Sequence, residues 1–389
     1  MNTFSEAIVL SGFQTLDFII FGVYVILIIS LGMFISHNRG EQEMSAANYF
    51  LADNTLTWWA VGASLIAANI SAEQFIGMAG TAFADGIAAA AYEIMAAVML
   101  VVIGKFLLPI MMERKIFTMP QFLRERYNDG VGLAFSILWL FLYVFVNLTS
   151  VAWLGALAIE QIFNLQGLEA DMGLMTVSVR MLIVLGLFII AGLYSIYGGQ
   201  ASVAWTDVMQ VAFFVGGGLI TAWIVLQEVG NAFGTSAGGI LVKIYEEVIT
   251  DAHETDHLHL IIQRSHNPEA FSNVPGITAI VGAVMLTNIT YWCFNQYIIQ
   301  KGLAAQNINE ARKGLLFAGF LKLIIPFIVV LPGLCAYYVY RLHPEVVSSL
   351  NLVGDIEKSD YAYPWLIRNF APTGIKGLAF VAKLRMSQG

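Results

Sequence analysis

The sequence predicts an all-α polytopic membrane protein, and three observations lead to this fold class. Hydrophobic residues make up 58% of the 389 residues and charged residues only 12%, which leaves too little polar surface for a water-soluble domain of this length. The apolar residues fall into runs of about 20 residues or more, long enough to cross the hydrocarbon core of a bilayer. Polar and apolar residues do not alternate with a period of two in these runs, so helices rather than barrel strands are expected.

The apolar runs predict the membrane-spanning helices of a single transmembrane domain, 1–389. We expect these helices at 16–36, 56–83, 86–112, 131–163, 173–197, 202–226, 276–300, 314–340 and 374–382. The first run is interpreted as a retained helix rather than a signal peptide, because acidic and not basic residues precede it and its length suits a full span. A turn is expected at Gly198–Gly199, and a long polar loop at 227–275.

Basic residues gather in two of the connections between the predicted spans. They are Arg114, Lys115, Arg124 and Arg126 in one connection and Lys301, Arg312 and Lys313 in the other. Positive charge near the ends of spans marks the cytoplasmic side of an inner (plasma) membrane, so we expect the N-terminus and the acidic 227–275 loop outside. The net charge of −8 comes without a basic stripe, so no nucleic-acid partner is expected.

Two predicted spans carry polar residues at the depth of the bilayer centre. The second span has Asn69, Ser71, Glu73 and Gln74 there, and the seventh has Asn288, Thr290, Asn295 and Gln296. Counted from the second span, these two begin successive five-helix groups, 56–226 and 276–389. Broken polar helices at corresponding positions indicate an inverted-repeat transporter with a binding site near the midplane. Hydrogen bonding between helices is the alternative for either set alone, and the matched positions favour the transporter.

Ionisable groups inside spans cost about 2.5–3.5 kcal/mol each on insertion scales, so they indicate function or pairing. They are Glu73, Glu93, Lys105, Asp207 and Lys322. One carboxylate, one ammonium, two or three carboxamides and an aromatic ring such as Tyr92 or Tyr291 suit a neutral polyhydroxy solute. For Lys322 the alternative is a structural ion pair with Glu93 or Glu73. For Glu73, which points away from its neighbour Gln74, we favour a structural role.

One short motif points to a different class of protein. His253 to His257 matches the zinc-peptidase pattern H-E-x-x-H. It lies in the polar loop without a long amphipathic helix around it, so a solvated loop is the preferred interpretation and no enzyme is expected. The two cysteines, Cys293 and Cys335, lie inside apolar runs and are interpreted as packing residues, not as a disulfide or a metal site.

Several longer segments resemble the sodium/solute symporter family, and within it the branch that carries sugars such as galactose or glucose. They are Trp58–Met78, Phe145–Val151, Tyr194–Gly199, Trp205–Val208, Phe294–Gln300 and Phe320–Leu323. The similarity runs from about the first span to Phe380. The resemblance implies a leucine-transporter-type inverted-repeat bundle with one extra N-terminal helix. It also implies sodium-coupled symport of a sugar by alternating access, with Na⁺, the sugar and the lipid bilayer as partners.

The resemblance also implies roles for individual residues. The residues that would bond sugar hydroxyls are Gln74, Glu93, Asn288 and Lys322. Met78 and Tyr92 would pack around the sugar, and Tyr291, supported by Asn295, would stack on its ring as the inner gate. The backbone carbonyls of Ala67 and Ile70 would face the sodium ion, and Asp207 would lie on the inward path of the ion.

Two departures from the family pattern affect these expectations. Ala96 stands where the sugar branch has a serine that contacts sugar, which leaves the sugar preference open. After Phe380 the family continues into a helix with a Ser-Ser pair that completes the sodium site, whereas this chain ends with Lys383 and Arg385 near its terminus. We therefore expect a truncated second repeat, with sodium-coupled transport weak or absent in this form and regained in a longer one. A symporter of another neutral solute and a non-transporting membrane sensor or binding module are the alternatives, and the oligomeric state is open.

Overall fold

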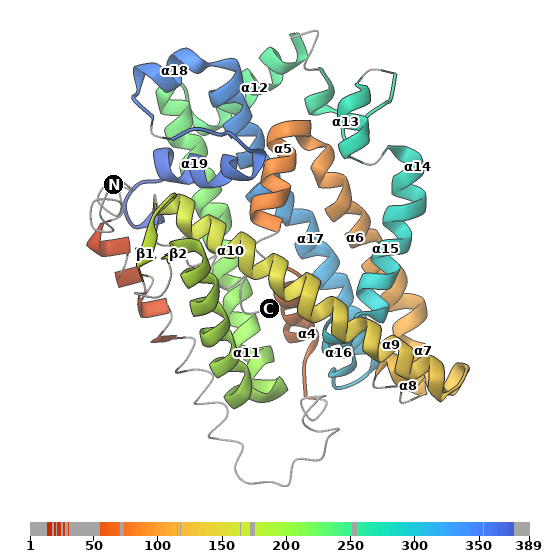
Figure 1. Ribbon diagram of the computed structural model, residues 1–389. Helices are drawn as coiled ribbons and strands as arrows, with labels where there is room; N and C mark the ends of the chain where they lie inside the picture. Colours follow the sequence, from red (N-terminus) through yellow and green to blue (C-terminus); the bar gives the residue numbers. More distant parts are fainter. Residues whose placement is uncertain are drawn as a thin grey trace.

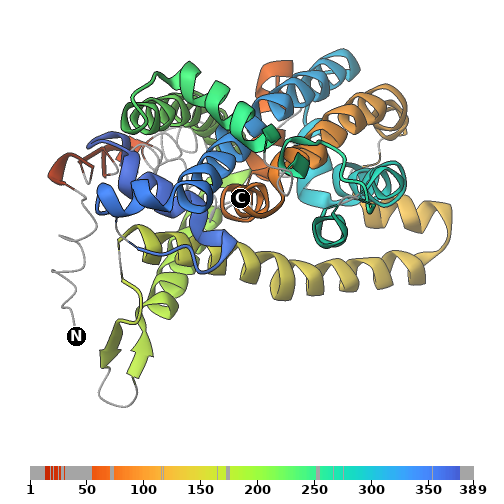
Figure 2. The ribbon, with the colours of Figure 1, turned by 90° about the horizontal axis from the view of Figure 1, so that it is seen from above.

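A computed structural model describes the protein over most of its length. The described residues are 14–17, 19–20, 22–24, 26–27, 30, 55–70, 74–114, 116, 118–163, 165–171, 176–250, 255–265, 267–274, 276–352 and 354–376. They form a bundle of helices with one short hairpin at its side (Figures 1 and 2). The predicted 16–36 helix lies partly outside these residues, as does nearly all of 374–382.

The helices follow one another along the chain, and η marks short 3₁₀- or π-helical segments. The first half contains α4 (Trp58–Asn69), η2 (Gln74–Met78), α5 (Ala79–Asp85), η3 (Gly86–Ala89), α6 (Ala90–Val102), η4 (Ile103–Leu107), α7 (Leu108–Glu113), α8 (Met119–Arg126), α9 (Asp129–Leu142), η5 (Tyr143–Leu148), α10 (Thr149–Ile162), β1 (Glu169–Asp171), β2 (Thr176–Ser178) and α11 (Val179–Ala232). Strands β1 and β2 pair antiparallel, with Glu169 opposite Ser178.

The second half continues in the same way. It contains α12 (Ala237–Thr250), η6 (Thr255–Leu258), α13 (Pro268–Asn273), α14 (Ile277–Ala279), η7 (Ile280–Val284), α15 (Met285–Ile289), η8 (Thr290–Phe294), α16 (Gln296–Leu303), α17 (Ile308–Tyr337), η9 (Tyr338–Leu342), α18 (Pro344–Ser349), η10 (Ser359–Tyr361) and α19 (Ala362–Phe370).

Five helical segments in the described part of the chain are long and apolar enough to cross a membrane. They are Gln74–Glu113, Asp129–Leu157, Trp205–Ala232, Ala270–Phe294 and Ile308–Leu342. Each overlaps a span predicted from the sequence. The all-helical membrane fold expected from composition is therefore confirmed.

Helix α17 is the central element, in contact with α4, α5, α6 and α11. It begins where the Asn307 side chain accepts hydrogen bonds from two backbone N–H groups of its first turn. Small residues let the neighbouring helices approach closely, as is typical of membrane proteins. A Cβ on Gly62 of α4 would lie 2.7 Å from the Gly314 carbonyl, and one on Gly333 would lie 2.3 Å from the Ala79 carbonyl. Larger side chains at these glycines would push the helices apart.

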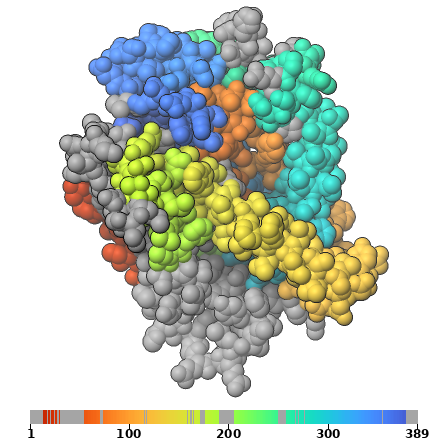
Figure 3. Space-filling view, in the orientation of Figure 1, coloured from red at the N-terminus to blue at the C-terminus, as the bar shows by residue number. Residues whose placement is uncertain are grey.

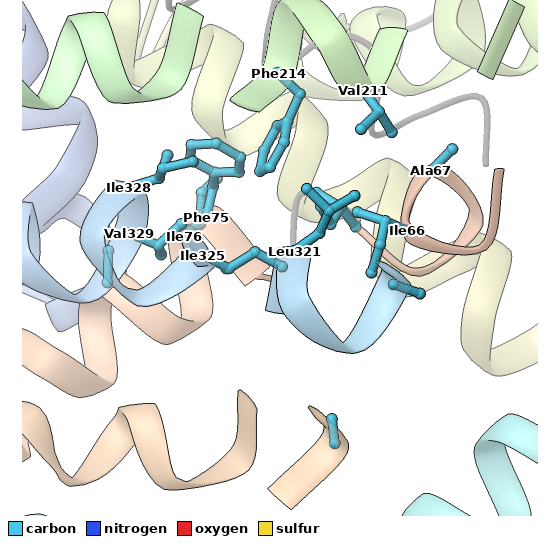
Figure 4. Packing of buried hydrophobic residues seen from close by; sticks show 14 of the residues in the cluster. Ile66, Ala67, Phe75, Ile76, Val211, Phe214, Leu321, Ile325, Ile328 and Val329 are labelled. Atoms are coloured by element: carbon cyan, nitrogen blue, oxygen red, sulfur yellow. The ribbon is translucent and has the colours of Figure 1, made fainter. Parts of the chain in front are cut away.

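Aromatic and branched side chains fill the space where η2, α11 and α17 meet (Figure 4). The Phe75 ring meets the Phe214 ring edge to face, with 5.2 Å between centroids. Phe75, Phe214 and Ile328 are all buried. Between helices in lipid, such packing replaces the hydrophobic effect as the source of stability. The buried cluster fixes the broken second span against the central helix.

Both predicted helix breaks are confirmed. Helix α4 ends at Asn69, and Ile70 is extended, with φ −76° and ψ 117°. In the seventh span the helical backbone ends at Phe294, and Asn295 is extended, with φ −81° and ψ 115°. The two breaks have nearly the same backbone conformation and begin corresponding groups of helices. This agreement supports the inverted repeat.

Three details of the predicted organisation are wrong. The backbone stays helical through Gly198 and Gly199, where a turn was expected. The 173–197 span begins later than predicted, because part of the β1–β2 hairpin occupies its start. The 227–275 segment is not a plain loop, since α12 lies within it. The inner face of α12 is buried at helical spacing, through Ala237, Ile240, Ile244 and Val248.

Candidate functional site

Two buried charges of opposite sign form the centre of the candidate site. Lys322 on α17 places its Nζ 2.7 Å from Oε2 of Glu93 on α6, and the two side chains are 2% and 4% exposed. A charge in an apolar interior is costly unless it is paired, so each group stabilises the other. The ion pair that was the alternative interpretation of Lys322 is therefore present. It does not exclude solute binding, because both groups keep further hydrogen-bonding capacity.

Gln74, at the start of the helical segment that follows the first break, joins this pair. Its Nε2 donates to Oε1 of Glu93 at 2.6 Å and lies 3.5 Å from Oδ1 of Asn69, the last residue of α4. Its Oε1 is buried and has no hydrogen-bond partner among the described residues. A buried acceptor without a donor costs about 1–3 kcal/mol. A ligand hydroxyl at this position would remove that cost.

The second broken helix reaches the same pair through Trp292. The Lys322 Nζ lies 5.6 Å from the centre of the Trp292 ring, a cation–π distance. The indole Nε1 donates to Oδ1 of Asn288 at 3.1 Å. Asn288 in turn donates to a backbone carbonyl one turn earlier in its helix. The four residues expected to bond a solute, Gln74, Glu93, Asn288 and Lys322, are thus linked in one network.

The predicted gate residues lie at the second break. The Tyr291 hydroxyl is 3.2 Å from the Tyr297 hydroxyl. The Asn295 side chain accepts a hydrogen bond from the Tyr143 hydroxyl at 2.7 Å. Asn295 is buried and Tyr291 partly buried. The sequence prediction paired Tyr291 with Asn295. In the structure, the partner of the Tyr291 hydroxyl is Tyr297, and the partner of the Asn295 side chain is Tyr143.

The two remaining predicted contacts lie nearby on η2 and α6. Met78 follows Gln74 by one helical turn and packs against a small cluster that contains Ala82, Ala90 and Val330. Tyr92 precedes Glu93 on α6 and is 38% exposed. Figure 3 shows a recess where the orange, cyan and yellow segments (α5–α6, α14–α15 and α9–α10) meet. Neighbouring residues of a helix point about 100° apart, so the exposed Tyr92 side chain and the buried Glu93 carboxylate lie on different faces of α6.

The end of α4 supplies the carbonyls expected to face a sodium ion. The Ile70 N–H still bonds the Ile66 carbonyl at 2.9 Å. The last carbonyls of any helix lack a helical partner, and those of Ala67 and Ile70 lie at this end. Oxygen ligands without a net charge suit a hard monovalent cation. The side chains of both residues are buried.

Asp207 on α11 lies at the centre of a second polar cluster. Its Oδ2 accepts from Ser64 Oγ on α4 at 2.6 Å and from Lys301 Nζ on α16 at 2.8 Å. All three residues are buried. Ser64 lies one helical turn before Ala67, so the carboxylate is anchored close to the end of α4. Lys301, interpreted from the sequence as a charge of a cytoplasmic connection, is instead buried and paired.

The motif that suggested a peptidase is only partly described. His253 and Glu254 lie outside the described residues, as does Glu73. His257 lies in the short turn η6, is 6% exposed and stacks on the Tyr337 ring with 4.2 Å between centroids. The solvated position expected for His257 is therefore wrong. Gly86 packs directly against the His257 backbone, and a Cβ there would lie 2.1 Å from its carbonyl oxygen.

A family model described as the sodium:solute symporter family matches residues 49–386. The chain belongs to the sodium:solute symporter family. It is 44% identical to a sodium/glucose cotransporter of Vibrio parahaemolyticus, over 95% of this chain and 65% of that protein. It is 31% identical to sodium/glucose cotransporter 1 of Sus scrofa, over 93% of this chain and 54% of that protein. The chain thus spans about half to two thirds of the length of these relatives.

The fold of this symporter-family chain is also found in a solved structure. A Na⁺-coupled sialic acid symporter in a substrate-bound, outward-open state superposes with a TM-score of 0.76, at 19% identity, over 96% of this chain and 71% of that one. The leucine-transporter-type inverted-repeat fold implied by the resemblance is confirmed. The protein is a multi-pass membrane protein of a transporter family, not an enzyme.

Sequence reasoning missed three residues of this symporter-family site. Trp292 joins the two broken helices, Tyr143 bonds the second break, and Lys301 pairs with Asp207. Tyr143 and Trp292 lie in apolar runs, where an aromatic residue is usually packing, so no local signal separated them from their neighbours. For Lys301 a signal existed, because it follows directly on the apolar run of the seventh span.

Proposed function

We propose that this protein is a sodium-driven symporter of a galactose- or glucose-like sugar that works by alternating access. The observation that carries the proposal is the network from Gln74 through Glu93, Lys322 and Trp292 to Asn288. It joins both broken helices, so a solute bound there touches the elements that alternating access moves. Membership of the sodium:solute symporter family supports the coupling ion.

In this proposal the sugar hydroxyls replace or extend the contacts of the network. The groups that bond the sugar are Gln74, Glu93, Asn288 and Lys322. The unpartnered Gln74 Oε1 supports a hydroxyl donor at this place. Met78 and Tyr92 pack around the sugar, and Tyr291, with Asn295, forms the inner gate.

The sodium ion is assigned to the break of the second span. The carbonyls of Ala67 and Ile70 face the ion, and Asp207 lies on its inward path. The end of helical backbone at Asn69 supports this assignment, because carbonyls there lack helical donors. The Ser64–Asp207 hydrogen bond supports a carboxylate close to this helix end.

The protein is proposed to lie in the inner (plasma) membrane with its N-terminus outside. Residues 16–36 form the extra helix, 56–226 the first repeat, 227–275 an extracellular segment and 276–389 the second repeat. The acidic segment with α12 and α13 lies at the opposite end of the bundle from α7, α8 and α16 (Figure 1). Basic residues near α7, α8 and α16 support a cytoplasmic position for that end.

The ion gradient supplies enough free energy for concentrative uptake. One charge that moves down 100 mV releases about 2.3 kcal/mol, and a tenfold gradient adds about 1.4 kcal/mol. With one ion per sugar these terms support roughly 500-fold accumulation. The stoichiometry is part of what the experiment must measure.

A second candidate is a symporter of a cyclic polyol. A relative of Mus musculus named sodium/myo-inositol cotransporter 2 is 29% identical over 96% of this chain. Ala96 is buried on α6, and on the family resemblance it replaces a serine that contacts sugar, which leaves the sugar preference open. Competition between galactose, glucose and myo-inositol for uptake separates the two candidates.

Uptake of labelled solutes into proteoliposomes tests the proposed function. In a form continued to the length of the Vibrio relative, an inward sodium gradient should drive uptake of galactose or glucose, and a potassium gradient of the same size should not. Gln74→Leu removes the carboxamide with little change in volume and should abolish this uptake. Uptake that is the same with either cation would refute sodium coupling.

A further inference from the structure

Tyr143 lies outside the solute network, in the segment η5 between α9 and α10. Its hydroxyl donates to Oδ1 of Asn295 at 2.7 Å and accepts from the backbone N–H of Gln296 at 3.2 Å. One hydroxyl thus holds both residues at the second helix break. Its ring also meets the Tyr297 ring edge to face, at 5.8 Å.

The hydrogen bonds at the start of α16 show what this hydroxyl does. The first N–H groups of a helix have no partner within the helix. The Asn295 carbonyl accepts from the N–H groups of Ile298 and Ile299, at 3.2 and 3.1 Å. The N–H groups of Gln296 and Tyr297 are left, and among the described residues the Tyr143 hydroxyl, not the Asn295 side chain, accepts from that of Gln296. Tyr143 therefore caps α16 from another helix, a task that a side chain at the helix start usually performs.

Tyr143 is also connected to the predicted gate. Tyr297 follows the capped residue, and its hydroxyl lies 3.2 Å from that of Tyr291. A shift of the start of α16 would therefore move Tyr297, whose hydroxyl is the partner of the Tyr291 hydroxyl. The η5 segment is π-helical, and such bulges are frequent at functional sites.

We propose that Tyr143 is a positioning residue that holds the break of the second discontinuous helix closed and, through Tyr297, sets the place of the gate residue Tyr291. The gate assignment rests on the proposed function, whereas the capping role at the break does not. Tyr143 acts on solute affinity without touching the solute. Loss of its hydroxyl removes the cap from the first turn of α16. This turn is then unwound for a larger fraction of the time, and we call this unwound state the open break.

Cys293 provides a reporter of this opening, because it lies two residues before the break and is buried. The other cysteine, Cys335, is replaced by alanine to leave one thiol. Alkylation of Cys293 by a small uncharged maleimide is then timed in Tyr143→Phe and in the control Tyr127→Phe, a residue that is 66% exposed just after α8. We expect alkylation about fivefold faster in Tyr143→Phe, the factor that corresponds to loss of a typical helix cap, and no change in the control.

A double variant separates positioning from a general loss of packing. With Asn295→Ala already present, Tyr143→Phe should still accelerate alkylation severalfold, because the cap on the Gln296 N–H does not pass through the Asn295 side chain. In a transport-competent preparation, Tyr143→Phe should raise the solute KM about fivefold with the maximal rate nearly unchanged. An unchanged alkylation rate overturns the proposal whether or not the protein transports. Faster alkylation in a form continued to the length of the Vibrio relative that carries no sugar would refute only the gate assignment and the proposed function.

Discussion

Removal of one charge of the Glu93–Lys322 pair should destabilise the protein more than removal of both. At the 2.7 Å separation of Nζ and Oε2, the attraction is about 6 kcal/mol with an effective dielectric constant of about 20. Desolvation of two ions costs several kcal/mol each, so the net contribution of the pair is small. A single charge left unpaired at this depth costs about 3–5 kcal/mol. That cost lowers the folded fraction relative to the unfolded one by roughly 150- to 4,000-fold.

Three variants separate stability from solute binding. Glu93→Gln and Lys322→Gln each leave one buried charge and should unfold at clearly lower temperature in detergent. The double variant removes both charges, keeps the shape of Glu93 and shortens Lys322 to a neutral amide, and should recover most of the lost stability. It should not recover sodium-driven sugar uptake, because a carboxamide pair bonds hydroxyls more weakly than the charged groups do. If the double variant transports like the parent, the pair is structural and the proposed sugar contacts are wrong.

Three further outcomes are expected. Gly333→Ala should lower the free energy of unfolding by about 1–3 kcal/mol or more, because its Cβ would lie 2.3 Å from a backbone carbonyl of α5. The control Gly216→Ala adds a Cβ with nothing within 4 Å. Equal melting temperatures of the two variants would contradict the close packing of α17. Asp207→Asn leaves Lys301 unpaired near the proposed ion path and should raise the sodium concentration needed for half-maximal uptake at least tenfold; an unchanged sodium dependence would remove Asp207 from that path. Burial raises the pKa of Asp360, so the folded state favours its protonated form and loses stability as the pH rises through that pKa. Asp360→Asn should therefore melt higher than the parent at neutral pH and equally at a pH below the usual range of an aspartate, and a pH-independent difference would contradict this.

The sequence was sufficient for the fold class and the two helix breaks. Asn69 and Asn295 stand out because polar residues in the middle of an apolar run have few reasons to be there. The pairing of Lys322 with a buried carboxylate was also predictable, since buried charges must find partners. That Gln74 and Asn288 join the pair was implied by the family resemblance. The contact that connects these residues was not predictable from the sequence. Trp292 carries the contact between Lys322 and Asn288, and nothing in the local pattern distinguishes it from a packing residue.

The errors have definite physical causes. Helix α12 was interpreted as loop because the 227–275 segment as a whole is polar and acidic, although the spacing of Ala237, Ile240, Ile244 and Val248 indicates a buried helical face. His257 was placed in solvent because it lies among polar residues, and its burial against Tyr337 is a tertiary contact. Local sequence patterns cannot predict contacts between residues that are far apart in the chain.

Sodium-driven accumulation of labelled galactose and glucose in proteoliposomes tests the central claim most directly. Because the chain spans 65% of the length of the Vibrio relative, the 389-residue chain is measured beside a form continued to the length of that relative. The account predicts sodium-dependent accumulation in the longer form that Glu93→Gln abolishes. Accumulation that persists in Glu93→Gln, or that potassium supports equally well, would contradict it.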